Sequence, residues 1–193
     1  YYGTLLVRKP TFVSLGLLPT FYATFGRAGE PDDHLEDVRA GRLSDTSRRI
    51  IDFLSASGET QTKRMRSALG IVSKEGKLAY DKAIDEVQRL MYVARVRAVG
   101  EGREDYNYTY DLFTRRYPEA VKRAERLSSA EATAALLERT LELAGAVSTK
   151  QLERLFEWGD ERSGRAIERL VASGRLARIE QGRTTLLVLS SLQ

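Results

Sequence analysis

The side chains best suited to do chemistry in this sequence are basic residues on segments with helical or hairpin spacing. Arg162, Arg165 and Arg169 recur at i, i+3 and i+7, which predicts one stripe of guanidinium groups along a helix. Ile167 and Leu170 fall on the opposite, apolar face. Guanidinium groups donate paired hydrogen bonds that match phosphate oxygens. The spacing therefore favours a helix that contacts a nucleic-acid backbone, as recognition helices do in the major groove of DNA.

Further basic residues form two sets, one directly after this stripe and one in an earlier part of the chain. Those on the expected hairpin after the stripe are Arg175, Arg178 and Arg183. Those of the earlier part are Lys63, Arg64, Lys74, Lys77, Lys82, Arg95, Arg97 and Arg103. The net charge is only +4, with 31 basic and 27 acidic residues, so local clustering rather than total charge would have to attract double-stranded DNA.

These basic stripes have a second interpretation. A helix with one buried face needs a solvated face, and Glu161 and Glu168 are spaced to pair with the arginines near them. In the earlier part, Asp81 and Asp85 lie beside the expected exposed face and would repel phosphates. The sequence leaves open a protein-interaction scaffold that does not bind nucleic acid, and a surface shared by the two basic helices would distinguish the two classes.

The aromatic and titratable side chains give weaker indications of a functional site than the basic residues do. Tyr106, Tyr108 and Tyr110 alternate along an expected strand and share one face, which we expect to pack on the protein's own core or N-terminal segment rather than on bases. Trp158 is expected to fill the junction between two helices. His34 lies among acidic residues, and we expect it in a solvated turn rather than in an acid–base cluster.

Composition and motifs exclude several classes of protein. The sequence has no cysteine and one histidine, which excludes disulfides and thiolate or multi-histidine metal sites. It has no phosphate-binding loop, dinucleotide fingerprint, nucleophile elbow or HExxH motif, so it predicts no enzyme class and no cofactor, although a single catalytic carboxylate would leave no motif.

No stretch approaches the roughly 20 apolar residues of a membrane span, and no signal peptide is recognisable, so we expect a soluble, cytoplasmic protein. Because the chain begins at Tyr1, we expect further residues to precede it.

An internal repeat indicates which elements position the basic residues. Residues 82–96 align without a gap with residues 165–179, and eight of the aligned pairs match in kind, among them Ala83/Ala166, Arg95/Arg178 and Val96/Ile179. Upstream the correspondence continues at a slightly larger offset, as in Gly58/Gly145. The chain is therefore predicted to contain two versions of one unit.

Each version has the pattern of three helices followed by a hairpin. In the second, Ser148 is placed as a helix N-cap and Gly174 as a left-handed C-cap. In this version the residues that mark the three helices lie within 136–144, 148–156 and 166–171, and the two expected strands are 175–179 and 184–189. In the first version the residues that mark the three helices lie within 50–54, 65–69 and 80–87, the expected strands are 92–99 and 106–112, and residues 71–78 lengthen the turn before the third helix. This order predicts a mainly α fold with small β-hairpins (α+β), namely tandem winged helix-turn-helix domains.

The remaining segments are expected to support the two winged helices. The predicted domains are an N-terminal arm packing on the winged helices at residues 1–42, a first winged helix at 43–114, a helical connector at 115–129 and a second winged helix at 130–193. The arm is expected to be extended or irregular over residues 2–18, with short helices near 19–23 and 33–40. The connector begins a helix near Pro118 and lacks the composition of a flexible linker, so we expect a rigid pair.

The second unit also resembles a known family. Residues 141–180 read LELAGAVSTKQLERLFEWGDERSGRAIERLVASGRLARIE, with a small-residue–Gly step, a Ser/Thr cap and an L-x-x-x-F-x-W stretch before the third helix. This segment resembles the winged-helix repeat of the AlkZ-like superfamily of DNA glycosylases and their relatives, and the resemblance covers about residues 5–189. It implies tandem winged helices with a basic, concave surface that holds duplex DNA.

The resemblance does not carry catalysis over to this chain. The glycosylases of the superfamily have a Gln-x-Gln or Gln-x-Asp motif. No glutamine of this sequence is followed two positions later by Gln or Asp; the glutamines are Gln61, Gln88, Gln151, Gln181 and Gln193. The resemblance therefore implies a smaller DNA-binding relative linked to DNA repair or transcription regulation, with no catalytic residue assigned, and an active AlkZ-like glycosylase stays as a third alternative.

Overall fold

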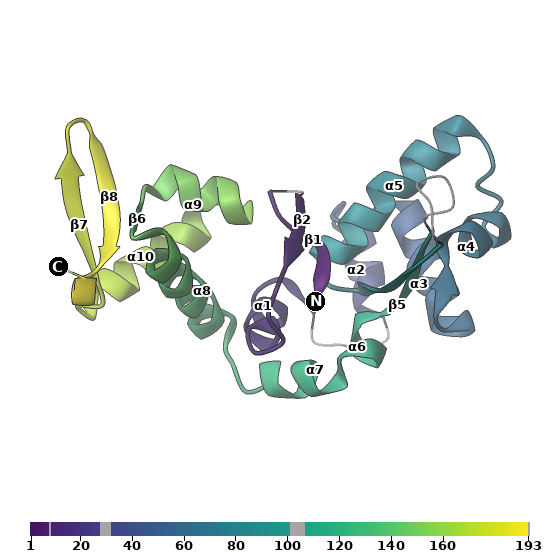
Figure 1. Cartoon of the computed structure of the whole chain (residues 1–193), viewed down its shortest axis with the longest axis horizontal. Helices are drawn as coiled ribbons and strands as arrows, with labels where there is room; N and C mark the ends of the chain where they lie inside the picture. The colour runs from purple at the N-terminus through teal and green to yellow at the C-terminus, as the bar shows by residue number, and fades with distance from the viewer. Residues whose placement is uncertain (8, 28–31, 101–106, 193) are drawn as a thin grey trace. The chain divides into compact units, whose positions relative to one another are not determined.

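The structure is a computed structural model that describes residues 1–7, 9–27, 32–100 and 107–192, with Val99, Asp160 and Leu192 described by their backbone alone. These residues form ten α-helices and three small antiparallel sheets. They divide into two compact units, Tyr1–Glu125 and Arg126–Gln193 (Figure 1). The predictions for Arg103 and Tyr106 lie outside the described residues. No helix among the described residues has the length and apolar character needed to cross a membrane.

The first unit begins with a hairpin and two short helices. Strand β1 (Tyr2–Leu6) pairs antiparallel with β2 (Lys9–Phe12), and α1 (Leu18–Phe25) and α2 (Asp33–Arg39) follow. The extended backbone predicted for this segment is confirmed, but its pairing into a hairpin was not predicted. Pro10 is compatible with the pairing because β2 is an edge strand, where a missing N–H costs no ladder hydrogen bond. The strand β1 contacts α5 and β4 of the same unit, described next.

Three helices form the centre of the first unit. They are α3 (Asp45–Ser57), α4 (Thr62–Ala68) and α5 (Lys74–Arg89). The hydroxyls of Ser44 and Ser73 cap α3 and α5 by accepting hydrogen bonds from backbone N–H groups of the first turn. Residues 71–78 were predicted to lengthen a turn, and this is wrong for most of them because the Ser73 cap starts α5 at Lys74. The buried core of these helices includes Ile50, Leu54, Met65, Tyr80, Ala83 and Val87.

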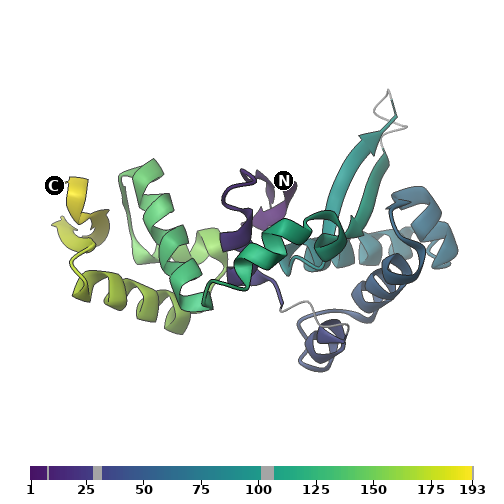
Figure 2. The same cartoon turned by 90° about the horizontal axis from the view of Figure 1, so that it is seen from below.

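A three-stranded sheet closes the helical part of the first unit. Its order is β3 (Thr60–Gln61), β5 (Asn107–Leu112) and β4 (Val93–Val99), all antiparallel neighbours. Figure 2 shows β4 and β5 as a hairpin that projects from the helices of this unit. The strands agree with the predicted hairpin to within a residue where they are described. Two short helices, α6 (Phe113–Arg116) and α7 (Pro118–Ala124), end the unit, and α7 begins at the proline expected to start a helix.

The second unit repeats this order of elements in a shorter form. Its helices are α8 (Ser129–Ala144), α9 (Thr149–Phe156) and α10 (Asp160–Ala172), and its strands are β6 (Ala146–Val147), β7 (Leu176–Gln181) and β8 (Thr184–Leu189). The sheet order is β6-β8-β7, and a single 3-10 turn, Ser190–Leu192, follows β8. Ser128 and Ser148 each close a capping box at the start of a helix. The first short strand thus pairs with the last strand in both units.

The two units also share backbone conformations at repeated positions. Gly58 and its counterpart Gly145 both have a positive φ, 74° and 76° respectively, immediately after a helix. The second residue after the third helix also has a positive φ in both units, at Met91 with φ 55° and at Gly174 with φ 69°. Glycine enters this left-handed region at little cost, whereas methionine does so under strain. The two units therefore have the same order of helices and strands, the same strand pairing and two positive-φ positions in common.

Candidate nucleic-acid interface

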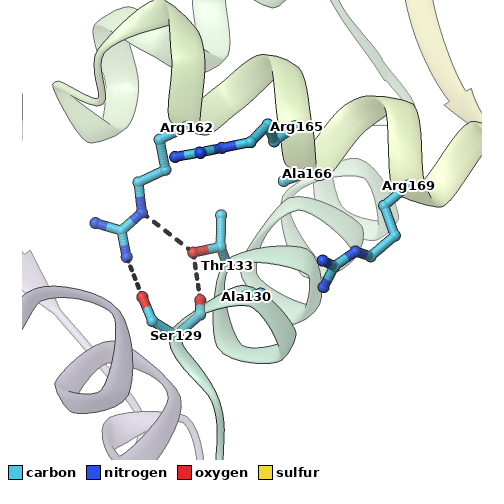
Figure 3. A pocket seen from close by; sticks show the side chains of 7 residues that line it. All are labelled: Ser129, Ala130, Thr133, Arg162, Arg165, Ala166 and Arg169. Atoms are coloured by element: carbon cyan, nitrogen blue, oxygen red, sulfur yellow. Dashed lines mark hydrogen bonds between the residues drawn. The ribbon is translucent and has the colours of Figure 1, made fainter.

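The predicted arginine stripe lies on α10 and lines a pocket inside the second unit. Arg162, Arg165 and Arg169 extend from α10 toward the first turns of α8, and the pocket between them has a volume of about 510 Å³ (Figure 3). The rest of its lining is Ser129, Ala130, Thr133 and Ala166. We call this site the arginine pocket. Ile167 and Leu170 are buried, as predicted, so the core holds α10 in the orientation that brings the three arginines together.

Arg162 is the most firmly held of the three arginines. Its Nη2 donates to Ser129 Oγ at 2.7 Å and its Nε donates to Thr133 Oγ1 at 3.3 Å. The guanidinium also lies over the Trp158 ring, 5.5 Å from the centroid. The side chain is half-buried, and this burial lowers the pKa of Arg162 from its ordinary value. Arg162 is therefore positioned by the fold and partly removed from water.

Arg165 and Arg169 are the exposed members of the pocket. The Arg165 side chain is 73% exposed and pairs with Glu161 at 3.0 Å, one helical turn away. An exposed pair of this kind contributes at most about 1 kcal/mol and can exchange its carboxylate for another anion. Within the described part of the chain, Arg169 forms no ion pair. Hydrogen bonds from Ser128 lower the pKa of Glu131, and the charge of Arg169 makes a smaller contribution in the same direction.

The start of α8 borders the arginine pocket, and its first turn also carries the Glu131 carboxylate, which accepts hydrogen bonds from Ser128. Ser129 and Ala130 are the first two residues of this 16-residue helix, where backbone N–H groups have no partner within the helix. A helix start carries about half a positive elementary charge and is a common place for phosphate binding. Among the described residues that line the pocket, none is acidic. The pocket is therefore suited to bind an anion with several oxygens.

The hairpin after α10 carries the other three predicted arginines of this unit. Arg175 pairs with Glu138, and Arg178 pairs with Glu168 at 2.5 Å. Arg183 lies exposed at the turn between β7 and β8. The glutamates partly neutralise two of the three hairpin arginines, as the solvated-face interpretation predicts. The arginine pocket is therefore the most positive part of the predicted interface in this unit.

The predicted basic residues of the first unit do not form a comparable pocket. Lys63 and Arg64 are exposed on α4, and Lys74, Lys77 and Lys82 are exposed along α5. Lys82 approaches Glu86 at 4.0 Å. On the strand β4, Arg97 pairs with Glu59 at 2.6 Å. These cations are dispersed, and several have carboxylates on the same surface.

Arg95 has aromatic partners in the first unit. Its guanidinium lies 3.8 Å from the centroid of the Tyr108 ring and 4.7 Å from that of the Tyr2 ring. Tyr110 is buried in the core beside Tyr108, which confirms that this strand face packs on the protein itself. Cation–π contacts of a partly desolvated arginine contribute about 2 kcal/mol. The placement indicates that Arg95 attaches β1 to β4 and does not belong to the exposed interface.

The structure agrees with the prediction for Trp158 and disagrees with the prediction for His34. Trp158 is buried and stacks on Phe156 at 4.2 Å between ring centroids, at the junction between α9 and α10, as predicted. The prediction that His34 lies in a solvated turn is wrong, because only 8% of the residue is exposed. Its Nε2 lies 2.8 Å from Asp52 Oδ1 on α3. The acidic neighbours of His34 in the sequence concealed this partner, which is 18 residues away.

The sequence prediction missed the α8 side of the arginine pocket. Ser129 and Thr133 hold Arg162, yet the apolar pattern placed the helix only from residue 136 onward. The signal was available, because Ser128 and Glu131 have the spacing of a capping box. That motif would have placed the start of α8, although not its contact with α10. Among the described residues, no group of three or more His, Asp or Glu side chains is arranged to hold a metal ion.

Comparison with known proteins adds a family assignment. The family described as AlkZ related matches residues 1–157. The match covers the first unit and the second unit as far as the end of α9, so the arginines of α10 and of the last hairpin follow the matched region. No curated protein and no solved structure matches the chain.

Proposed function

The chain belongs to the AlkZ-related family, and from this premise we propose that it binds double-stranded DNA through two winged helices. Support for the fold comes from the order helix, strand, helix, helix, hairpin in both units, with the first short strand paired to the last strand. We propose winged helices at residues 43–114 and 130–193, an N-terminal arm at 1–42 and a connector at 115–129. In such a fold the third helix, here α5 or α10, is the element that approaches DNA.

The arginine pocket is the observation that carries this proposal. A backbone phosphate presents two charged oxygens, and the guanidinium groups of Arg165 and Arg169 can donate to them in pairs. Arg162 is already held by Ser129 and Thr133, so binding would not have to immobilise it. The α8 start offers backbone N–H groups on the same side. The chemistry of the pocket is therefore that of a phosphodiester site at the edge of α10.

This chemistry predicts DNA binding with little sequence preference. Contacts to phosphates position a protein on the duplex but do not distinguish base pairs. Each neutralised phosphate releases condensed counterions, so the logarithm of the affinity falls with the logarithm of the salt concentration by about 0.9 per contact. We therefore propose a structural or repair-associated DNA-binding role, or a role in transcription regulation in which sequence is recognised by other parts of the surface.

A titration of fluorescently labelled duplexes tests the proposal. Two duplexes of equal length and different sequence should bind at low salt with similar affinities, and both affinities should fall steeply as salt rises. Absence of binding at low salt would overturn the proposal and favour the protein-interaction scaffold. Affinity that does not change with salt would also contradict it, because phosphate contacts require counterion release.

A further inference from the structure

The arginine pocket is bridged at one end by the side chain of Arg162. This side chain extends from α10 to α8, where it donates to Ser129 Oγ at 2.7 Å and to Thr133 Oγ1 at 3.3 Å (Figure 3). Arg169 lies at the other end of the stripe, seven residues and about 10 Å further along α10. The pocket is therefore bounded by two helices and, at one end, by the Arg162 bridge.

Packing holds the Arg162 bridge in place. The guanidinium lies over the ring of Trp158, which is itself buried and stacked on Phe156. Thr133 is buried, and its hydroxyl donates to the Ser129 carbonyl at 2.6 Å, so both acceptors of Arg162 belong to one ordered turn. A nucleic-acid strand that passed through the whole pocket would have to displace Arg162 and break these hydrogen bonds. A strand that ends in the pocket would leave them intact.

The pocket is large enough to enclose a phosphate group. Its volume of about 510 Å³ is within the range of small-molecule sites. Ala130 and Ala166 contribute only methyl groups to the lining, so the space between the guanidinium groups is not filled by long side chains of either helix. A phosphate can therefore enter the pocket and meet donors on several sides, instead of touching the protein with one edge.

The charge of the pocket suits a phosphate with more than one negative charge. Three guanidinium groups line it, whereas the carboxylates of Glu161 and Glu131 lie nearby but outside the lining. When both carboxylates and the start of α8 are counted, an excess of about 1.5 positive charges remains. A phosphodiester inside a strand carries one negative charge. A terminal phosphate carries about 1.5–2 at pH 7 and has three oxygens that accept hydrogen bonds, so it matches this excess more closely.

The repeat shows that this arrangement is particular to the second unit. Because residues 165–179 align with residues 82–96, Arg165 corresponds to Lys82 and Arg169 corresponds to Glu86. The Glu86 carboxylate accepts hydrogen bonds from the Ser44 N–H group at 2.9 Å and from a serine hydroxyl of α3 at 2.6 Å. The first unit thus has a carboxylate of its own where the second unit has a cation, and only the second unit offers this position to an anion from outside.

We propose that the arginine pocket binds the terminal phosphate of a DNA strand, a phosphate monoester at an end, a nick or a gap. The phosphate would lie between Arg165 and Arg169, with its free oxygens toward the Arg162 bridge. The same group occurs at 5′ and 3′ ends, and the two sources are separated by experiment. This inference rests on the proposed DNA binding and adds which phosphate enters the pocket.

Hairpin duplexes with one open end test the inference. One hairpin sequence is prepared with a 5′-hydroxyl, a 5′-phosphate or a 5′-methylphosphate, which is a singly charged diester at the same place. A second series carries the same three groups at the 3′ end. Fluorescence anisotropy, with the label in the hairpin loop, measures the affinities at one salt concentration. A phosphate end should bind about tenfold more tightly than either other end of its series, because it makes further charge-assisted hydrogen bonds. The series that shows this preference identifies the end.

Two variants of α8 with the same change of charge locate the site. Ala130→Glu places a carboxylate in the pocket and should remove the preference for a phosphate end. The first turn of a helix favours an acidic side chain, so the fold should be kept. Ala135→Glu adds the same charge at an exposed position of α8 outside the lining and should retain the preference. Circular dichroism checks that both variants are folded.

The outcomes separate this inference from the proposed function. If the three ends of each series bind equally well, or phosphate and methylphosphate do, the inference is overturned and duplex binding stands. A preference that persists in Ala130→Glu also overturns it, because the terminal phosphate then binds elsewhere. If only phosphate ends bind, the inference is supported and the contacts to internal phosphates are contradicted. If no hairpin binds at low salt, both are overturned.

Discussion

At the scale of single residues, Asp37 is the most strongly held charge in the described structure. Its carboxylate is fully buried and accepts hydrogen bonds from Arg27, Arg42 and the Tyr92 hydroxyl. Burial alone would raise the pKa of Asp37, but these hydrogen bonds outweigh it and hold the pKa below its ordinary value. This hydrogen-bond network joins α2, the loop after α2 and the start of the β4–β5 hairpin.

We predict that Asp37→Asn lowers the free energy of unfolding by about 1.5–3 kcal/mol at neutral pH, the usual contribution of hydrogen bonds to a charged group. Because the folded pKa of Asp37 is depressed, its stabilisation is complete above the ordinary aspartate pKa and is lost as pH falls through the folded value. The difference between the two proteins should therefore shrink at acid pH. Urea denaturation at pH 7 and near pH 3 measures both effects.

Asp45→Asn is the matched control for this residue. Asp45 is 69% exposed and pairs with Arg48 on the surface of α3, so its replacement should change stability by less than about 1 kcal/mol. Equal losses of unfolding free energy for Asp37→Asn and Asp45→Asn would contradict the predicted role of the buried carboxylate. A difference for Asp37→Asn that stays constant with pH would contradict it as well.

At the scale of elements, two glycines of the second unit have opposite backbone conformations. One follows α10 and the other lies inside it. Gly174 ends the helix with a φ of 69°, and an added Cβ there would meet no atom within 4 Å. Gly164 lies inside α10 with ordinary helical backbone and equally open surroundings. Strain alone therefore decides the effect at Gly174, and helix propensity decides it at Gly164.

We predict opposite signs for alanine at these two positions. Gly174→Ala should lower the free energy of unfolding by about 1–2 kcal/mol, because alanine is forced into the left-handed region. Gly164→Ala should raise it by about 0.5–1 kcal/mol, because alanine has the higher helix propensity. Chemical denaturation of both variants at the same pH compares them. The account of the helix end would be wrong if Gly174→Ala were neutral or stabilising.

The sequence predicted elements well where local patterns determine them. Apolar spacing and the residue types at turns located α9 and both hairpins to within two residues, and placed α10 without its first turn. It missed the pairing of β1 with β2, because Pro10 indicated a break in the strand pattern. It also missed the two-residue strands β3 and β6, because they are too short to have a period and their partners are distant in the sequence. It also started α5 too late, because the exposed turn after Ser73 has no apolar stripe.

In the candidate site, too, local sequence patterns predict some features, whereas others depend on residues that are distant in the sequence. Helical spacing alone placed Arg162, Arg165 and Arg169 on one side of α10. Spacing could not show that Ser129 and Thr133 of another helix hold Arg162, or that Tyr2 and Tyr108 pack on Arg95. Identical arginines of the repeat thus differ in role: Arg95 is covered by rings, whereas its counterpart Arg178 remains exposed beside Glu168.

At the scale of the whole molecule, a net charge of +4 is too small to explain strong DNA binding by itself. The proposed function depends instead on where positive charge is concentrated within one unit. The arginine pocket has three guanidinium groups and a helix start, while the lysines of α5 are dispersed along the exposed face of that helix beside acidic residues. Residues on the two surfaces should therefore contribute unequally to DNA affinity.

The most direct test compares the salt dependence of duplex binding between two double variants. Arg165→Ala with Arg169→Ala removes two exposed cations of the arginine pocket and spares Arg162, whose hydrogen bonds to Ser129 and Thr133 support the fold. Lys74→Ala with Lys77→Ala removes the same charge from α5. We predict that the arginine variant loses about two from the magnitude of the log–log salt slope, and the lysine variant less than half of that. A normal slope for the arginine variant together with a reduced slope for the lysine variant would show that the first unit, and not the arginine pocket, contacts the DNA backbone.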